Sequence, residues 1–279
     1  GVCLADNRPS YCVVLHIEEI RKPGKWNATI DETEKVIGQL EKILGVPRQI
    51  TRADIERHVM KGQLPLPLIV WRNVSVEVLA KLAESNSDLL SADISVEAVR
   101  SYPNGTLAAH VLGYVGRAEA KTAGSEDEEA ENYDFYMPEM EGRYGIEKSL
   151  NDELTGKEGW RRLQVDASGY TKSKLAEHDP WSGNEVVLTI DSRVQKAAEE
   201  VIADRRGAVV VMDPRNGDVL ALASSPGFDP NAFSPSIAVE TWARAMGDSR
   251  KPLFNRAVSG QYAPGSIFKP LVALAALEA

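Results

Sequence analysis

Cysteines, histidines and long apolar runs are scarce in this sequence, and each shortage excludes a class of protein. The two cysteines, Cys3 and Cys12, are too few for a disulfide framework. We interpret them as two unpaired, buried thiols; positions on neighbouring strands of one hairpin are the alternative. The four histidines lack the spacing of zinc ligands, so a zinc site is not expected.

Membrane spans and basic stretches are also absent from the sequence. No run of about 18 apolar residues occurs, and residues 1–4 (GVCL) lack the basic start and apolar core of a signal peptide. The formal net charge is -9 at pH 7, and no basic stretch could neutralise phosphates, which excludes nucleic acid as a partner. What is present, 43% hydrophobic and 26% charged residues in 279 positions, is typical of a globular protein long enough for two domains.

Hydrophobic patterns divide the chain into two parts at the polar stretch 179–183 (DPWSG). In the first part, residues 1–18 predict a β-hairpin with its turn at DNRP, residues 6–9. Apolar spacing predicts further helices at 30–44, 51–60, 75–83 and 145–154, and strands at 64–70, 95–103, 160–166 and 170–175. Residues 118–131 contain an acidic run and few apolar residues, which predicts a solvated loop rather than a metal site.

The second part predicts strands that alternate with helices. We expect a strand at 185–190, a helix at 191–203, and two strands at 207–213 and 218–224 around an Asn-Gly turn. Both of these last strands are apolar on both faces, so helices should cover them. The helix that begins near Ser266 is one candidate for that cover.

Ser266 and Lys269 form the most informative motif, an S-x-x-K sequence ahead of the apolar run 271–277. Residues three apart on a helix share one face, which can bring the lysine amine within hydrogen-bonding reach of the serine oxygen. A neutral amine there could accept the hydroxyl proton and make the serine a nucleophile. The alternative for an isolated match is a serine that caps a helix, followed by a solvated lysine.

The surroundings of the motif favour the catalytic interpretation. Residues 261–270 (QYAPGSIFKP) resemble the acylation segment of penicillin-binding proteins. Further segments resemble a class B penicillin-binding protein along nearly the whole chain: LADNRPSY at 4–11, HVLGYVG at 110–116, GIEK at 145–148, RGAVVVMDPRNGDVLA at 206–221 and PGFDPN at 226–231. The pattern of the first part is most similar to the elongation type, penicillin-binding protein 2, with the division type as the alternative.

This resemblance implies an α+β protein with two domains. Residues 1–175 would form a mixed α/β pedestal, or dimerisation, domain. Residues 181–279 would form the first part of a transpeptidase domain of the serine β-lactamase-like fold, truncated after the S-x-x-K helix. The family's S-x-N and K-[ST]-G motifs would lie downstream, so we expect this fragment to be inactive. A membrane helix is expected just before Gly1, which would anchor the protein in the inner membrane with this region on the periplasmic side.

The resemblance also implies an activity, peptidoglycan D,D-transpeptidation in cell elongation and shape. Ser266 would be the acyl-ester nucleophile, with its backbone N–H in the oxyanion hole, and Lys269 the general base. No metal or organic cofactor is needed. The implied partners are stem peptides, β-lactams as inhibitors, a membrane glycosyltransferase and a rod-shape scaffold protein. The alternatives are a non-catalytic scaffold or interaction module of the cell-wall synthesis complex, a division-type transpeptidase, and a serine β-lactamase or penicillin sensor.

Overall fold

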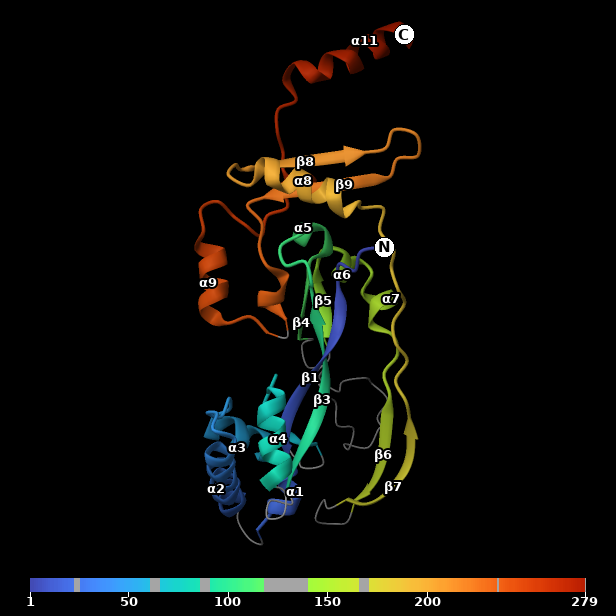
Figure 1. The fold of residues 1–279 in the computed structure, drawn as a ribbon. Coiled ribbons are helices and arrows are strands. Elements are labelled where there is room, and N and C mark those ends of the chain that lie inside the picture. The colour runs from blue at the N-terminus through green and yellow to red at the C-terminus, as the bar shows by residue number, and fades with distance from the viewer. Residues whose placement is uncertain are drawn as a thin grey trace.

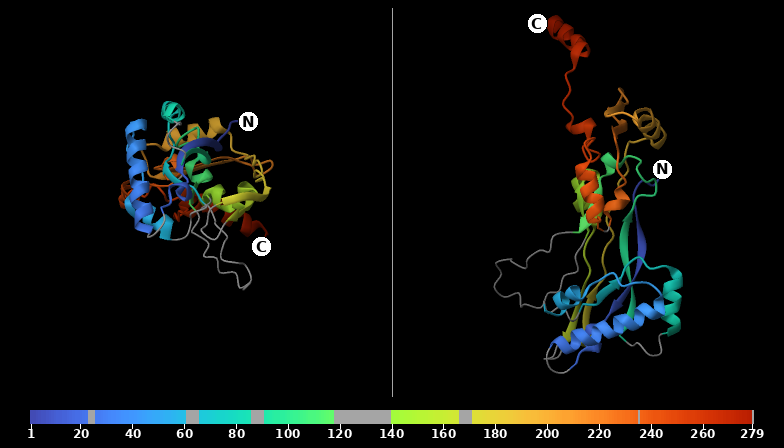
Figure 2. Two further views of the ribbon diagram at one scale, coloured as in Figure 1. Left: turned by 90° about the horizontal axis from the view of Figure 1, so that it is seen from below. Right: turned by 90° about the vertical axis from the view of Figure 1, so that its left-hand side faces the viewer.

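A computed structural model describes residues 1–22, 26–60, 66–85, 91–117, 140–165, 171–234 and 236–278. The molecule is elongated (Figure 1), with a helical base at one end and the C-terminal helix at the other. A long two-stranded stem connects the base to the upper elements, and the two further views in Figure 2 show the same separation. Among the described residues, no helix is long and apolar enough to cross a membrane.

The stem consists of β1 (Asp6–Leu15) and β3 (Ala92–Ser101), which pair antiparallel along their whole length. The short strand β2 (Leu68–Trp71) joins the other side of β1, next to Val13, Val14 and Leu15 only. The predicted hairpin at residues 1–18 is therefore wrong, because β1 continues straight through the expected turn. Pro9 is tolerated there because β2 does not reach it, so that side of β1 is an edge that needs no N–H donor.

The base packs four helices onto the lower end of the sheet: α1 (Ile17–Ile20), α2 (Trp26–Leu44), α3 (Arg52–Met60) and α4 (Val76–Ser85). Apolar residues of α2 at helical spacing, Ile30, Ile37, Leu40 and Leu44, are buried against the sheet, together with Trp71. The helix ends at Gly45, whose φ of +71° suits a residue without a Cβ. The predicted helices at 30–44, 51–60 and 75–83 are confirmed, as is the strand at 95–103.

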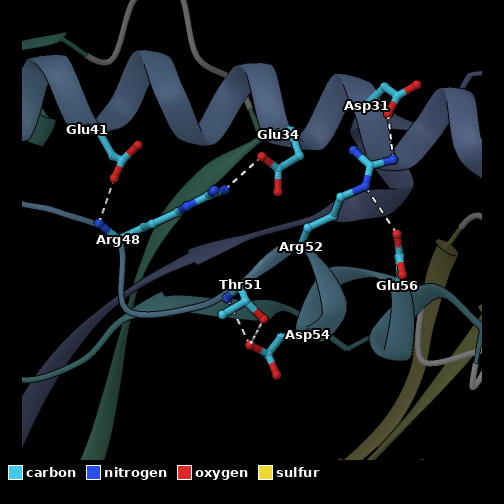
Figure 3. Close-up of polar contacts among 8 residues, drawn as sticks. All are labelled: Asp31, Glu34, Glu41, Arg48, Thr51, Arg52, Asp54 and Glu56. Carbon is cyan, nitrogen blue, oxygen red and sulfur yellow. Dashed lines mark hydrogen bonds and ion pairs between the residues drawn. The ribbon is translucent and has the colours of Figure 1, made fainter.

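Charged residues on the surface of the base hold α3 and the preceding connection onto α2 (Figure 3). Arg52 reaches Asp31 on α2 at 2.7 Å and Glu56 on α3 at 3.1 Å, while Arg48 reaches Glu34 at 2.8 Å. The two pairs of Arg52 are about half exposed, so each contributes on the order of 0–1 kcal/mol, whereas the Arg48–Glu34 pair is more buried. These ion pairs join α3 and the connection before it to α2.

Above the stem lies a region that we call the neck, residues 102–117 and 140–155. It contains α5 (Ala109–Leu112), β4 (Tyr114–Arg117), β5 (Met140–Tyr144), α6 (Gly145–Ser149) and α7 (Asn151–Thr155), with β4 paired to β5. The helix predicted at 145–154 is thus interrupted at Leu150. The predicted loop at 118–131 lies entirely outside the described residues, which end at Arg117 and resume at Met140.

The hairpin β6 (Trp160–Val165) and β7 (Thr171–His178) confirms the predicted strand pair. Residues 185–190, predicted as a strand, instead run without regular secondary structure. In this segment Leu188 packs against Tyr102 and Leu112 of the neck, and the Thr189 hydroxyl donates to the Val219 carbonyl oxygen. Leu188 is thus used for packing between two regions, while Val187 is exposed.

The C-terminal part of the fold, residues 185–278, begins with α8 (Ser192–Ile202) and the hairpin β8 (Gly207–Met212) and β9 (Val219–Ser225). Ala198 and Ile202 of α8 pack on Ala221 and Ala223 of β9, so α8 is the helix that covers this hairpin. Then follow the 3-10 turn η1 (Pro230–Phe233), α9 (Val239–Gly247), α10 (Arg256–Ser259), the 3-10 turn η2 (Gly265–Phe268) and α11 (Lys269–Glu278).

Candidate functional site

Ser266 lies in η2, and Lys269 is the first residue of α11. In a 3-10 turn, residues three apart lie nearly above one another, so the two side chains leave the chain on the same side. Gly265 has a φ of +54°, which sets the sharp entry into the turn. Within residues 236–278, no side-chain hydrogen bond joins Ser266 to Lys269. The structure therefore gives the expected order of turn, serine and helix without a formed serine–lysine contact.

The segment that carries Ser266 and Lys269 lies apart from the rest of the molecule (Figure 1). Its apolar side chains are exposed, with Ile267 at 81% and Leu277 at 85% of full exposure. The apolar residues of α11 occur all round the helix, a pattern that belongs to a helix buried on every side. The structure does not place this helix on β8 and β9: α8 packs on one face of the hairpin, Val210 and Met212 of β8 are exposed, and α11 contacts η2 instead.

The root of this segment is α10, which residues 260–264 connect to η2. Asn255 caps α10, since its side-chain oxygen accepts from the backbone N–H groups of Ala257 and Val258. Arg256 is buried and donates to the carbonyl oxygens of Lys251, Phe254 and Arg250. These bonds hold the turn before α10 in one conformation.

His110 in the neck contacts the same turn from the other side. Its Nε2 lies 2.8 Å from the Pro252 carbonyl oxygen, and its backbone oxygen accepts from Asn255 Nδ2 at 3.3 Å. The ring is buried and packs edge-on against Phe228 at 5.2 Å. Burial lowers the pKa of His110, the hydrogen bond to Pro252 opposes that shift, and the charge of Arg256 adds to the lowering. Burial and the charge of Arg256 therefore favour the neutral form of the His110 imidazole.

A second polar contact between the neck and the C-terminal part is made by Asn231 of η1. Its amide oxygen accepts from the Tyr102 N–H at 2.9 Å, and its amide nitrogen donates to the Tyr102 carbonyl at 3.0 Å. Glu199 of α8 adds a bond from the Ala108 N–H at 2.8 Å. Apolar packing accompanies these bonds, since Phe228 and Phe233 are buried together with Ala109 of α5. We call this set of contacts the joint.

Other polar and thiol side chains have structural roles. Asp213 and Asp229 accept hydrogen bonds within their own turns, from the backbone N–H groups of Arg215 and Asn231. Both cysteines are free as expected, but only Cys12 is buried and Cys3 is exposed. In the part of the chain that the structure describes, no group of histidine, cysteine and carboxylate side chains could hold a metal ion.

Comparison with known proteins places the chain in a family. Residues 1–188 match the penicillin-binding protein dimerisation domain, and residues 207–279 match the penicillin-binding protein transpeptidase domain. The chain therefore belongs to the penicillin-binding proteins that combine these two domains.

Within that family the chain is similar to relatives named peptidoglycan D,D-transpeptidase MrdA. Identity is 34% to the Acinetobacter baumannii protein and 31% to that of Escherichia coli K12, each over 100% of this chain. The chain spans 39% and 42% of those two relatives, well under half of either. The solved complex of PBP2 and MreC from Helicobacter pylori is similar in fold, with a TM-score of 0.67 at 29% identity, over 99% of this chain and 49% of that one. The resemblance to the elongation type and the mixed α/β fold class are thereby confirmed.

The joint is the feature that sequence reasoning missed. His110 and Asn231 both lie in segments that carry the family resemblance, HVLGYVG and PGFDPN, but nothing in the sequence pairs the two segments. No sequence pattern places His110 at a contact between regions, where its ring and its backbone carbonyl both form hydrogen bonds.

Proposed function

We propose that the chain is the pedestal, residues 1–175, and the beginning of the transpeptidase domain, residues 181–279, of an elongation-type peptidoglycan D,D-transpeptidase. One observation carries the proposal. The S-x-x-K pair Ser266 and Lys269 falls inside the segment that matches the transpeptidase family, at the start of an apolar helix. The names of the MrdA relatives support the same activity.

In this proposal Ser266 is the nucleophile and Lys269 the general base. The serine oxygen attacks the carbonyl carbon of the penultimate D-Ala, while the neutral lysine amine takes the hydroxyl proton. The bond to the terminal D-Ala breaks, and that residue leaves as the free amine with the proton. An amine from a neighbouring stem peptide then attacks the acyl ester, forms the cross-link and returns the serine hydroxyl. The backbone N–H of Ser266 supplies one hydrogen bond to the oxyanion.

β-Lactams follow the first half of the same reaction. Their strained amide resembles the D-Ala-D-Ala unit, so the serine opens the ring and remains acylated. Neither step requires a metal ion or an organic cofactor. A fluorescent penicillin is therefore the direct probe of Ser266.

The proposed partners are a membrane glycosyltransferase and a rod-shape scaffold protein. The solved complex of a similar PBP2 with MreC supports a scaffold partner of that kind. We propose the periplasmic side of the inner membrane as the place of action, because the stem peptides that would be cross-linked lie there.

The test is to label the full-length protein with a fluorescent penicillin and map the acylated peptide by mass spectrometry. We expect one acyl group, on Ser266, and no label on Ser266→Ala, with the thermal midpoint of that variant unchanged. Absence of label from the wild-type protein would favour a non-catalytic scaffold. A label on another residue would contradict the role assigned to Ser266.

A further inference from the structure

His110 is placed where the neck meets the root of the segment that carries Ser266. The imidazole Nε2 binds the Pro252 carbonyl at 2.8 Å, and the backbone carbonyl of the same residue binds Asn255 Nδ2 at 3.3 Å. One residue of the neck thus holds both ends of the turn 252–255. Because a carbonyl oxygen can only accept, Nε2 must carry the proton in this contact.

The turn that His110 holds leads directly to the nucleophile. Asn255 is the N-cap of α10, and residues 260–264 connect the end of α10 to η2 and Ser266. Arg256 fixes the preceding residues of the loop through three carbonyl oxygens. The contacts of the turn with the neck therefore fix the start of α10, from whose end residues 260–264 lead to Ser266.

We propose that His110 is a positioning residue for acylation: its ring nitrogen fixes Pro252, its backbone carbonyl fixes Asn255, and the two contacts together orient the segment that carries Ser266. The inference rests on the proposed function of Ser266. His110 lies in the segment that matches the dimerisation domain, and the inference gives it a role in the reaction of the segment that matches the transpeptidase domain.

The charges around His110 favour the neutral form of its imidazole ring. Arg256 of α10, which is buried, is the neighbouring charge that disfavours a second proton on the ring. Asp248 and Arg250 of the adjoining loop pair with each other at 3.0 Å.

The other charged groups of the packed elements have partners of their own or are exposed. Glu147 of α6 pairs with Arg100, Asp229 before η1 accepts from Asn231, and Lys251 is exposed. A proton added to His110 would leave the bond from Nε2 to the Pro252 carbonyl in place, but it would put a second positive charge beside Arg256 in a buried site, which destabilises the packing of the turn on the neck.

The test uses the full-length protein and the rate of acylation of Ser266 by a fluorescent penicillin, separated into the binding constant Ks and the acylation rate k2. His110→Ala should lower k2 at least about tenfold and leave Ks nearly unchanged. His110→Gln should restore most of k2 at pH 7.5, because its amide nitrogen can donate to the Pro252 carbonyl. Since glutamine does not titrate, this variant should also lose less of k2 than the wild type between pH 7 and pH 5.

The matched control is His58 in the base, a buried histidine whose Nε2 lies 3.1 Å from the Leu66 carbonyl. His58→Gln should leave k2 and its pH profile unchanged. Acylation of His110→Ala at the wild-type k2 would overturn the inference while leaving Ser266 acylation intact. Should His110→Ala fail to fold, a pH profile of His110→Gln identical to that of the wild type would overturn it. A wild-type protein that is not acylated at all would instead contradict the proposed function.

Discussion

Arg100 at the upper end of β3 and Glu147 on α6 form an ion pair with 2.7 Å between Nε and Oε1. Only 18% of the Arg100 side chain and 6% of the Glu147 side chain are exposed. The Tyr102 hydroxyl donates to the same carboxylate oxygen at 3.2 Å, and burial, together with the charge of Glu147, raises the pKa of Tyr102. Tyr102 is also the residue whose backbone Asn231 binds. The stem, the neck and the C-terminal part therefore meet at one small polar cluster.

Breaking this pair should destabilise the protein strongly. Glu147→Gln leaves the Arg100 guanidinium without a countercharge in a buried position, and we expect a loss of about 3–5 kcal/mol in the free energy of unfolding. Glu141→Gln is the matched control, because it removes an exposed pair with Arg143 at 3.5 Å and should cost less than about 1 kcal/mol. Denaturant unfolding of both variants measures the difference. Equal losses of unfolding free energy in the two variants would mean that burial does not make the Arg100–Glu147 pair more important for stability than an exposed pair.

The backbone contact between Gly113 and Gly145 should not tolerate a side chain. Gly113 has a φ of +83°, and a Cβ there would overlap the Tyr144 carbonyl group. Gly113→Ala should therefore lower the free energy of unfolding by about 2–5 kcal/mol, from backbone strain and overpacking together.

Gly38 of α2 is the control for the free energy of unfolding, because a Cβ at this position meets nothing within 4 Å. Gly38→Ala should stabilise the protein by about 0.5–1 kcal/mol, because alanine restricts the unfolded chain and favours the helix. A Gly113→Ala variant as stable as wild type would contradict the close approach of the two backbones.

His110 should make the stability of the fold sensitive to acid. Because its pKa is lowered in the folded state, the unfolded chain binds the proton more readily. The contribution of the neutral ring is present above the unfolded pKa of about 6.5 and is lost as the pH falls below it. A single group changes stability by at most about 1.4 kcal/mol per pH unit.

Denaturant unfolding between pH 7.5 and pH 5 of the wild type and of His110→Gln isolates this effect. The wild type should lose stability relative to the variant as the pH falls. A constant difference across that range would show that His110 keeps its ordinary titration in the folded protein.

Local sequence patterns were sufficient for elements whose packing depends on nearby residues. Apolar spacing from Ile30 to Leu44 and the stop at Gly45 define α2, and the Asn-Gly turn at 216–217 defines the β8–β9 hairpin. The S-x-x-K motif likewise located Ser266 at the start of a helix.

Contacts between distant segments could not be predicted in the same way. The polar residues at 6–9 favour a turn by themselves, and only the pairing of β1 with β3 about 90 residues later makes them a strand. Similarly, Asn231 recognises the backbone of Tyr102, which leaves no signature in side-chain chemistry. The apolar run 271–277 predicts a buried helix, but it does not say which surface receives it.

The most direct test of the account is the acylation rate of Lys269→Arg in the full-length protein, measured with a fluorescent penicillin beside wild type and Ser266→Ala. Arginine keeps the positive charge but stays protonated, so it cannot accept the proton of the Ser266 hydroxyl. We predict that Lys269→Arg is acylated at least about a hundredfold more slowly than wild type, within the range of general-base effects. Ser266→Ala should show no acylation. Acylation of Lys269→Arg at close to the wild-type rate would show that Lys269 is not the base and would contradict the proposed mechanism.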